Sequence, residues 1–259
     1  SAVSQLHAGP RGWLKFTAPY SIGIDKIAPL LGEFHARHPE VRVELILSNE
    51  PLDLIGGEID VALRLGNLPD SNLVARRLGT LRTQVYAATS YLAKHGEPLH
   101  PNDLQHHRVM AMPKHRHGNN YHWTLNDGNG DQEFVVNPIL VANDPAALKG
   151  ALLCGEGVMI AADVMVKPFV EMGVVQRVLA GWIGGEYELN AVFPRGHTQS
   201  PKVRAFVDFL LEHLNLEIDY MSAHCPLMMA KEAKHAHEQE REAEETAAVG
   251  LRILEAVTA

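Results

Sequence analysis

Apolar and polar residues alternate in the first part of the chain and predict strands on either side of a helix. Trp13–Thr17 is predicted to be a strand, and Val41, Val43 and Leu45 alternate with charged residues as in a strand with one wet face. Between these strands, apolar residues recur at helical spacing, and Pro39 ends the helix. The residues at helical spacing are Ile24, Ile27, Ala28, Leu31 and Phe34.

The run from Pro51 to Gly66 predicts the next helix and a buried strand. A short helix ends at the glycines that follow Ile55, and an apolar strand leads to Arg64. Gly66 then breaks the strand. Because the carboxyl ends of strands border the ligand crevice of an open α/β sheet, this pattern puts a cation where a small molecule would bind.

The remaining pattern repeats the alternation of strands and helices. Asp144 and Pro145 suit the N-cap and the first position of a helix. Further helices are predicted to start at Asp163 and at Pro201. The predicted strands are Leu73–Leu78, Thr83–Ala88, Val109–Met112, His122–Leu125, Phe134–Val141, Gly157–Ala161 and Tyr187–Phe193. Two successive α/β patterns predict a parallel α/β protein with two lobes and a cleft between them.

Composition narrows the class of protein. The 259 residues are 46% hydrophobic and 21% charged, which is ordinary for a globular protein. The net charge of −8 argues against direct binding of nucleic acid. Two distant cysteines, no signal sequence and no membrane-length apolar run predict a reduced cytoplasmic protein that does not bind a membrane.

Several segments resemble the effector-binding domain of LysR-type transcriptional regulators, in continuous order over residues 5–214. They are Ile27–Phe34, Arg37–Val41, the run from Pro51 to Gly66, Leu68–Gly79, Tyr91–Gly96 and Ser200–Phe206. The resemblance implies two Rossmann-like lobes with the type 2 periplasmic-binding-protein-like fold, joined by crossover strands near Thr83–Ala88 and Ala191–Phe193. It implies a homodimer or homotetramer, and DNA binding only through a winged helix-turn-helix that is absent from this sequence.

The resemblance also divides the chain. Residues 1–12 are expected to end a linker, residues 13–85 and 194–215 to form lobe I, and residues 86–193 to form lobe II. Residues 216–259 depart from the family pattern and are predicted to form a helical extension, with a frayed tail as the alternative.

The resemblance implies that a small effector, often an organic acid, binds between the lobes, and we predict that the effector is anionic. Helix amino ends favour anions, which points to the loops before the predicted helices of both lobes. The anion is expected to contact Ser21, Arg64 and Asn143. The full set of predicted effector-binding residues is Ala18, Pro19, Tyr20, Ser21, Ser48, Asn49, Arg64, Asn143, Asp144 and Pro145.

Simpler roles for these residues stay open. Ser21 and Asp144 are equally suited to capping their own helices, and Arg64 to a salt bridge. A histidine-rich stretch over residues 95–122 lacks the spacing of a zinc site, so no metal or other cofactor is expected. No nucleophile elbow or phosphate loop is present, and Cys154 is expected to be a buried, inert thiol.

The pattern and the resemblance together predict the sensing and oligomerisation domain of a transcriptional regulator, without enzymatic activity. One alternative is the solute-binding module of a transport system, because such proteins share the two-lobed architecture. Another is an assembly module that binds nothing in its cleft.

Overall fold

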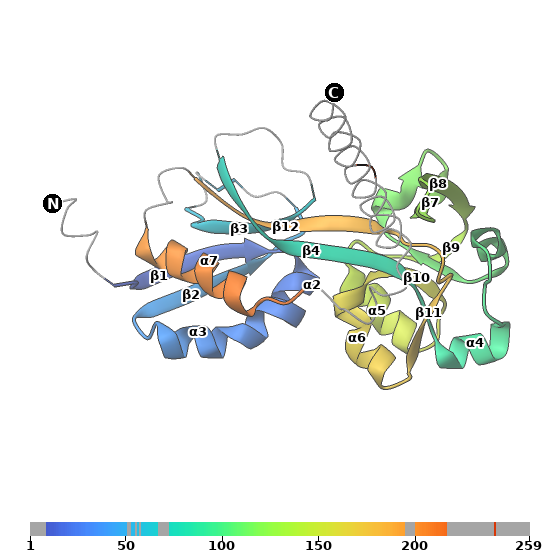
Figure 1. Cartoon of the computed structure of the whole chain (residues 1–259), viewed down its shortest axis with the longest axis horizontal. Coiled ribbons are helices and arrows are strands. Elements are labelled where there is room, and N and C mark those ends of the chain that lie inside the picture. The colour runs from blue at the N-terminus through green and yellow to red at the C-terminus, as the bar shows by residue number, and fades with distance from the viewer. Residues whose placement is uncertain are drawn as a thin grey trace, which may run out of the picture.

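Two lobes joined by two long strands make up the computed structural model, which describes residues 9–50, 53, 54, 56, 58–66, 73–194, 200–216 and 241 (Figure 1). The predicted helix after Pro51, most of the linker and most of the carboxyl-terminal extension lie outside these residues. The strands are β1 (Gly12–Ala18), β2 (Val41–Leu47), β3 (Val61–Leu65), β4 (Leu73–Ala88), β5 (Val109–Ala111), β6 (Arg116–His117), β7 (Asn120–Asn126), β8 (Asp131–Val136), β9 (Pro138–Val141), β10 (Val158–Ala162), β11 (Val175–Val178) and β12 (Gly185–Pro194).

Helical segments connect most of these strands. The α-helices are α2 (Tyr20–Ile22), α3 (Leu31–Arg37), α4 (Thr89–His95), α5 (Pro145–Leu153), α6 (Asp163–Glu171) and α7 (Pro201–His213). Shorter turns of other helix types are η1 (Gly23–Ile27), η2 (Ala28–Leu30), η3 (Pro101–His106) and η4 (Pro113–His115). Within the described residues, no helix is long and apolar enough to span a bilayer.

A single sheet of nine strands runs through both lobes. Its order is β2-β1-β3-β12-β4-β10-β5-β9, and β11 pairs with β4. On the lobe I side, β2, β1 and β3 are parallel, and on the lobe II side β10, β5 and β9 are parallel. Strands β4 and β12 cross between the lobes as an antiparallel pair, from Leu73 opposite Pro194 to Thr83 opposite Gly185. The parallel strands of each lobe therefore end toward the region where the lobes meet.

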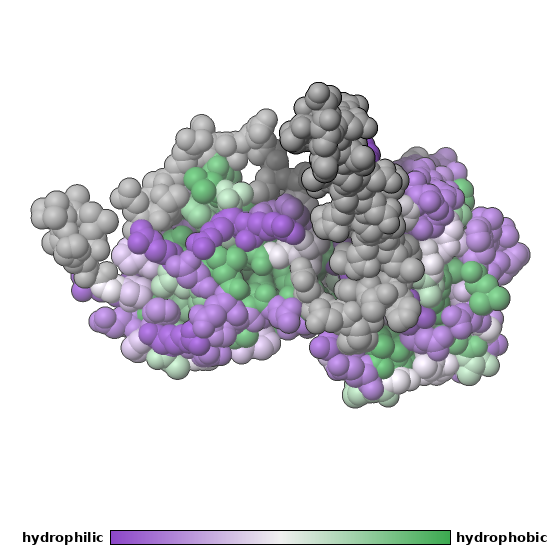
Figure 2. Space-filling view, viewed as in Figure 1, coloured by the Kyte–Doolittle hydropathy of each residue, from purple (hydrophilic) through white to green (hydrophobic). Residues whose placement is uncertain are grey.

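Aromatic packing holds the helices of lobe I on one face of its strands. Phe16 of β1 lies 4.5 Å from Phe206 of α7, measured between ring centroids. Phe34 of α3 contacts both Phe206 and Phe209 of α7. These rings are buried, and burying one aromatic side chain stabilises a fold by roughly 2–3 kcal/mol. The opposite, outward face of α3 carries hydrophilic side chains (Figure 2), so the packing fixes which face of the helix meets the sheet.

Lobe II has helices on one side and a small sheet on the other. Leu148 of α5 and Val164 of α6 pack with Met159 of β10 in one core cluster. The three-stranded sheet β6-β7-β8 contributes Trp123 and Leu125 to a second cluster.

Two predictions, on the strands within residues 73–88 and on Cys154, are wrong. Leu73–Leu78 and Thr83–Ala88 are parts of one strand, β4, and not two short strands. Phe134–Val141 is strand as predicted, although it is divided between β8, in the small sheet, and β9, at the edge of the large sheet. Cys154 is exposed, because it follows the last residue of α5, where the helical periodicity ends.

Candidate functional site

The ends of the parallel strands in lobe I form one group of loops. The amide of Ser48, just after β2, donates to the carbonyl of Ala18 at the end of β1. Pro19 occupies the N-cap position of α2, and the next amide, that of Tyr20, donates to Oδ1 of Asn49 at 3.1 Å. The loops after β1 and β2 are therefore tied together at the edge of the sheet.

Asn49 also joins lobe I to lobe II. Its Nδ2 donates to Oδ2 of Asp144 at 2.8 Å and to the carbonyl of Asn143 at 3.2 Å. The other carboxylate oxygen of Asp144 accepts from the amide of Ala146 at 2.7 Å, so Asp144 caps α5 as predicted, with Pro145 in its first turn. One amide side chain thus connects the loops at which helices begin in both lobes.

The two serines have local roles. Ser21 is the second residue of α2 and is buried, and no side chain caps this helix. The proposed capping role of Ser21 is therefore wrong. The hydroxyl of Ser48 accepts from the amide of Glu50 at 3.1 Å and so shapes its own turn. Ser48 lies in the same loop as Asn49, and Ser21 lies in the first turn of the helix that follows β1.

Arg64 lies near the end of β3, opposite Asn190 of β12. Its Nη2 atom is buried and has no hydrogen-bond partner, and the guanidinium forms no ion pair with any described residue. The salt-bridge alternative for Arg64 is therefore wrong within this part of the chain. Burial without a countercharge lowers the pKa of the Arg64 guanidinium. A cation in this situation is stabilised by any anion that reaches it.

Thr17 is a second buried polar group without a partner, and the sequence analysis missed it. Its Oγ1 atom is buried with no hydrogen bond to a described residue, and the residue is in register with Ala62 of the neighbouring β3. Because side chains alternate along strands, Arg64 lies two residues farther along β3 on the face that Ala62 and Thr17 share. The sequence did contain a signal for this group, because side chains alternate along β1 and the polar Thr17 lies next to the end of the strand.

A second contact across the lobes was also missed. The ammonium of Lys149 in α5 lies 2.5 Å from Oδ2 of Asp25 in η1. The adjacent Lys26 is half-buried, and this burial lowers the pKa of its ammonium despite the nearby carboxylate of Asp25. No local pattern reveals this contact, because 124 residues separate its partners.

The loops predicted from the sequence to form the site therefore contact one another, whereas Arg64 forms no hydrogen bond with them. Backbone and side-chain contacts connect Ala18, Pro19, Tyr20, Ser48, Asn49, Asn143, Asp144 and Pro145. Arg64 shares its strand edge with this group through β1 and β3 but bonds to none of its members. The arrangement suits noncovalent binding of an anion by a guanidinium and a hydroxyl.

The histidine-rich stretch has ordinary packing roles. Burial, with help from the charge of Lys114, lowers the pKa of His115 to about 4, and its ring lies edge-on to Trp123. His117 and His122 stack on each other. Among the described residues, no three His, Cys, Asp or Glu side chains are grouped as metal ligands.

Comparison with known proteins gives a consistent result. The family model described as the LysR substrate binding domain matches residues 7–215. A transcriptional regulator of the HTH type from Xanthomonas campestris is 60% identical over 100% of this chain and 76% of its own length. The regulator CrgA from Neisseria meningitidis serogroup B is 30% identical over 81% of this chain and 69% of its own length.

Solved structures have the same fold. The regulatory domain of CrgA, a LysR-type transcriptional regulator from Neisseria meningitidis, gives a TM-score of 0.72 at 29% identity, covering 80% of this chain and 100% of that one. The full-length Vibrio cholerae virulence activator AphB gives a TM-score of 0.70 at 27% identity, covering 82% of this chain and 72% of that one.

Proposed function

This chain belongs to the LysR-type transcriptional regulators and contains their substrate-binding domain, and we propose that the domain senses a small organic anion between its two lobes. The fold is the two-lobed, type 2 periplasmic-binding-protein-like α/β fold of LysR regulatory domains. The relatives with curated names are transcriptional regulators, which favours this function over solute transport and over catalysis.

The observation that carries the proposal is the unpaired guanidinium of Arg64. Its Nη2 atom is buried without a partner near the end of β3, and the hydroxyl of Thr17 on the neighbouring β1 is equally unpartnered among the described residues. A carboxylate that accepts from both groups would satisfy two buried donors at once. Hydrogen bonds between charged groups are about twice as strong as neutral ones, so the anionic part of the effector would supply most of the affinity.

The proposed signal is a shift between two arrangements of the lobes. Asn49 holds the loops of both lobes together next to the strand ends that carry Arg64 and Thr17. An anion at Arg64 changes the balance only if it binds one arrangement of the lobes more tightly than the other. Reversing a 1:99 population requires a preference of about 10⁴-fold, and smaller preferences shift it in part.

We propose that the change in lobe arrangement reaches DNA through a separate domain. We propose that the substrate-binding domain forms homodimers or tetramers, and that effector binding alters how the subunits are arranged. A DNA-binding domain of the winged-helix type would then change its spacing on DNA. Such a regulator would act in the cytoplasm, where its DNA is located.

Isothermal titration calorimetry with a panel of small mono- and dicarboxylates tests the proposal. We expect at least one carboxylate to bind the wild type, and the Arg64→Met variant to bind it at least 10-fold more weakly. Arg76→Met is the matched control, because Arg76 pairs with Asp208 on the exposed surface of lobe I. Equal binding by the wild type and Arg64→Met, or no binding by any carboxylate, would refute the proposed site.

A further inference from the structure

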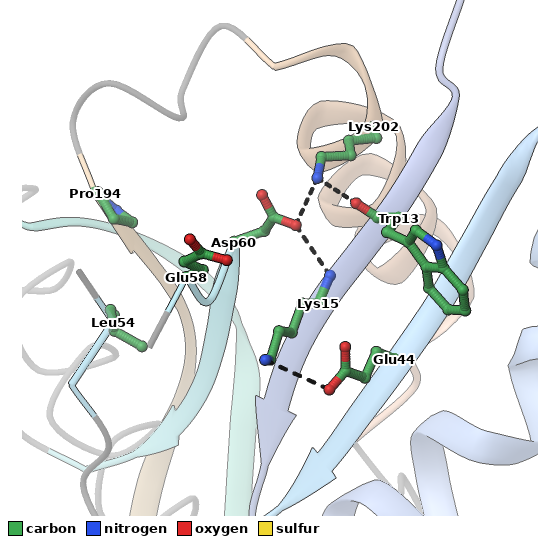
Figure 3. Close-up of a pocket in the computed structure, with 8 residues that line it drawn as sticks. All are labelled: Trp13, Lys15, Glu44, Leu54, Glu58, Asp60, Pro194 and Lys202. Carbon is green, nitrogen blue, oxygen red and sulfur yellow. Dashed lines mark hydrogen bonds and ion pairs between the residues drawn. The ribbon is translucent and has the colours of Figure 1, made fainter. Parts of the chain in front are cut away.

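A cavity lies in lobe I, toward the starts of the parallel strands and away from the loops that Asn49 connects. Its volume is about 500 Å³, and its walls come from β1, β2, the segment before β3, the end of β12 and the start of α7 (Figure 3). None of the residues assigned to the interlobe site lines this cavity, although Lys15 and Thr17 are only two positions apart on the same face of β1, or about 7 Å at roughly 3.3 Å per residue. The two sites are therefore neighbours with separate lining residues.

Two of the charged side chains that line this cavity, Asp60 and Lys202, form bonds that stabilise the fold. Oδ2 of Asp60 accepts from the backbone amide of Lys15 at 2.9 Å and from the ammonium of Lys202 at 2.7 Å. The same ammonium also donates to the carbonyl of Trp13. These bonds join β1, the residue just before β3 and the first turn of α7, and they engage both Asp60 and Lys202 in holding the fold together.

The other charged side chains that line the cavity, those of Lys15, Glu44 and Glu58, take no part in these bonds. The ammonium of Lys15 has a loose partner among the described residues, Oε1 of Glu44, at 3.5 Å. Glu58 forms no hydrogen bond or ion pair with any described residue, and its backbone has a φ of 53°, which is uncommon for a residue other than glycine. Figure 3 shows the carboxylate of Glu58 and the ammonium of Lys15 facing one space, with Leu54 at its side.

We propose that this cavity binds a small zwitterion of the α-amino acid type with an apolar side chain. The carboxylate of the ligand would pair with the ammonium of Lys15, and its ammonium would pair with Glu58 and Glu44. Leu54 and Pro194 supply the apolar wall for its side chain. Cavities of 300–1,000 Å³ that combine an apolar wall with a few polar groups are typical of small-molecule sites.

The mixture of charges argues against simpler ligands. An anion alone would approach Lys15 but would also face the carboxylates of Glu44 and Glu58. A cation alone would approach those carboxylates but would be repelled by Lys15. A ligand that carries both charges offers each of the three groups an opposite charge to pair with.

L-leucine is the probe, and calorimetry with the wild-type chain measures its affinity. We expect L-leucine to bind at least 10-fold more tightly than N-acetyl-leucine, which lacks the ammonium, and than leucinamide, which lacks the carboxylate. Equal affinities for the three compounds, or no binding of L-leucine, would overturn the proposal.

Variants of the lining residues test whether L-leucine binds in this cavity. Glu58→Gln and Lys15→Met should each weaken L-leucine at least 10-fold, whereas Arg64→Met, at the other site, should leave its affinity unchanged. Lys15→Met keeps the backbone amide that donates to Asp60, and an unfolding curve for each variant verifies folding. Loss of binding in Arg64→Met with full binding in Lys15→Met would place the amino acid between the lobes and would refute this cavity as its site. The carboxylate panel for Arg64 is a separate experiment, so either proposal can fail alone.

Discussion

The side-chain amide of Asn49 donates to the carboxylate of Asp144 at 2.8 Å, although 95 residues separate the two in sequence. Asn49 comes from lobe I, and Asp144 caps the first helix after β9 in lobe II. With the bond from the amide of Tyr20 to Oδ1, the side chain of Asn49 uses both its donor and its acceptor groups. It is therefore a specific point at which the relative position of the lobes can be changed by mutation.

Asn49→Asp should separate the lobes. The new carboxylate would still accept from the amide of Tyr20 but would face the carboxylate of Asp144. Repulsion between such exposed charges is about 1 kcal/mol in water, enough to favour a more open arrangement. Small-angle X-ray scattering at low protein concentration should give a larger radius of gyration than the wild type.

The double variant Asn49→Asp with Asp144→Asn is the matched control. It reverses the donor and the acceptor, and the asparagine introduced by the second substitution can still cap α5, because Asn is as good an N-cap as Asp. The radius of gyration should return to the wild-type value. An unchanged radius in the single variant would show that this bond does not hold the lobes together.

Arg64→Met and Arg82→Met should have different effects on stability. Arg64 has no countercharge among the described residues, so its loss should leave the free energy of unfolding unchanged or raise it by up to about 1 kcal/mol. Arg82 pairs with Glu186 at 3.1 Å, and both side chains are largely buried, so its loss should cost about 3 kcal/mol. Urea unfolding at pH 7 measures the free energy of unfolding of both variants. A loss in Arg64→Met as large as the loss expected for Arg82→Met would mean that the charge of Arg64 is paired.

Asp163 should make the wild type relatively more stable at acidic pH. Burial raises the pKa of its carboxyl, although Gln84 and Tyr86 donate to it at 2.8 Å. A raised pKa in the folded state gives stability below the unfolded-state pKa, about 3.9, and this stability is lost as the pH rises through the folded-state value. Relative to Asp163→Asn, the wild type should therefore be more stable at pH 4 than at pH 7.

Comparing the wild type with Asp163→Asn isolates the contribution of Asp163 to the pH dependence of stability, because the other titrating groups are common to both proteins. Asn at this position can accept from Gln84 and donate to the hydroxyl of Tyr86, so its folding should be preserved. Urea unfolding of both proteins between pH 4 and pH 7 provides the data. A difference in unfolding free energy that stays constant across this range would contradict the raised pKa.

His115 should titrate far below the usual range for histidine. Its pKa of about 4 arises from burial, whereas an unperturbed imidazole has a pKa of about 6.5. Because the pKa is lowered in the folded state, the stability from this residue is lost as the pH falls from 6.5 toward 4. NMR titration of the histidine ring signals, assigned with a His115→Gln variant, should give a midpoint near 4, and a midpoint near 6.5 would be the contrary result.

Strands and helices with strong local signals could be predicted from sequence. Alternation identified β2, and the Asp144–Pro145 pair identified the start of α5, because capping depends on neighbouring residues only. The loops predicted to meet at the interlobe site do meet through Asn49. Whether those loops bind an effector stays a prediction.

Features that depend on distant residues could not be predicted. Leu73–Leu78 and Thr83–Ala88 have the pattern of two strands, yet Gly79 between them continues the single strand β4. The contact between Asp25 and Lys149, and the lack of a described partner for Arg64, likewise depend on packing across the fold. Local periodicity contains no information on such contacts.

A crystal structure of the chain soaked with the carboxylate that binds most tightly in calorimetry would test the central claim most directly. The account predicts difference density between the lobes, with a carboxylate oxygen about 2.7–2.9 Å from Nη2 of Arg64, the usual range for a charge-assisted hydrogen bond. Density for the carboxylate elsewhere on the molecule, with the guanidinium of Arg64 still unpaired, would contradict it.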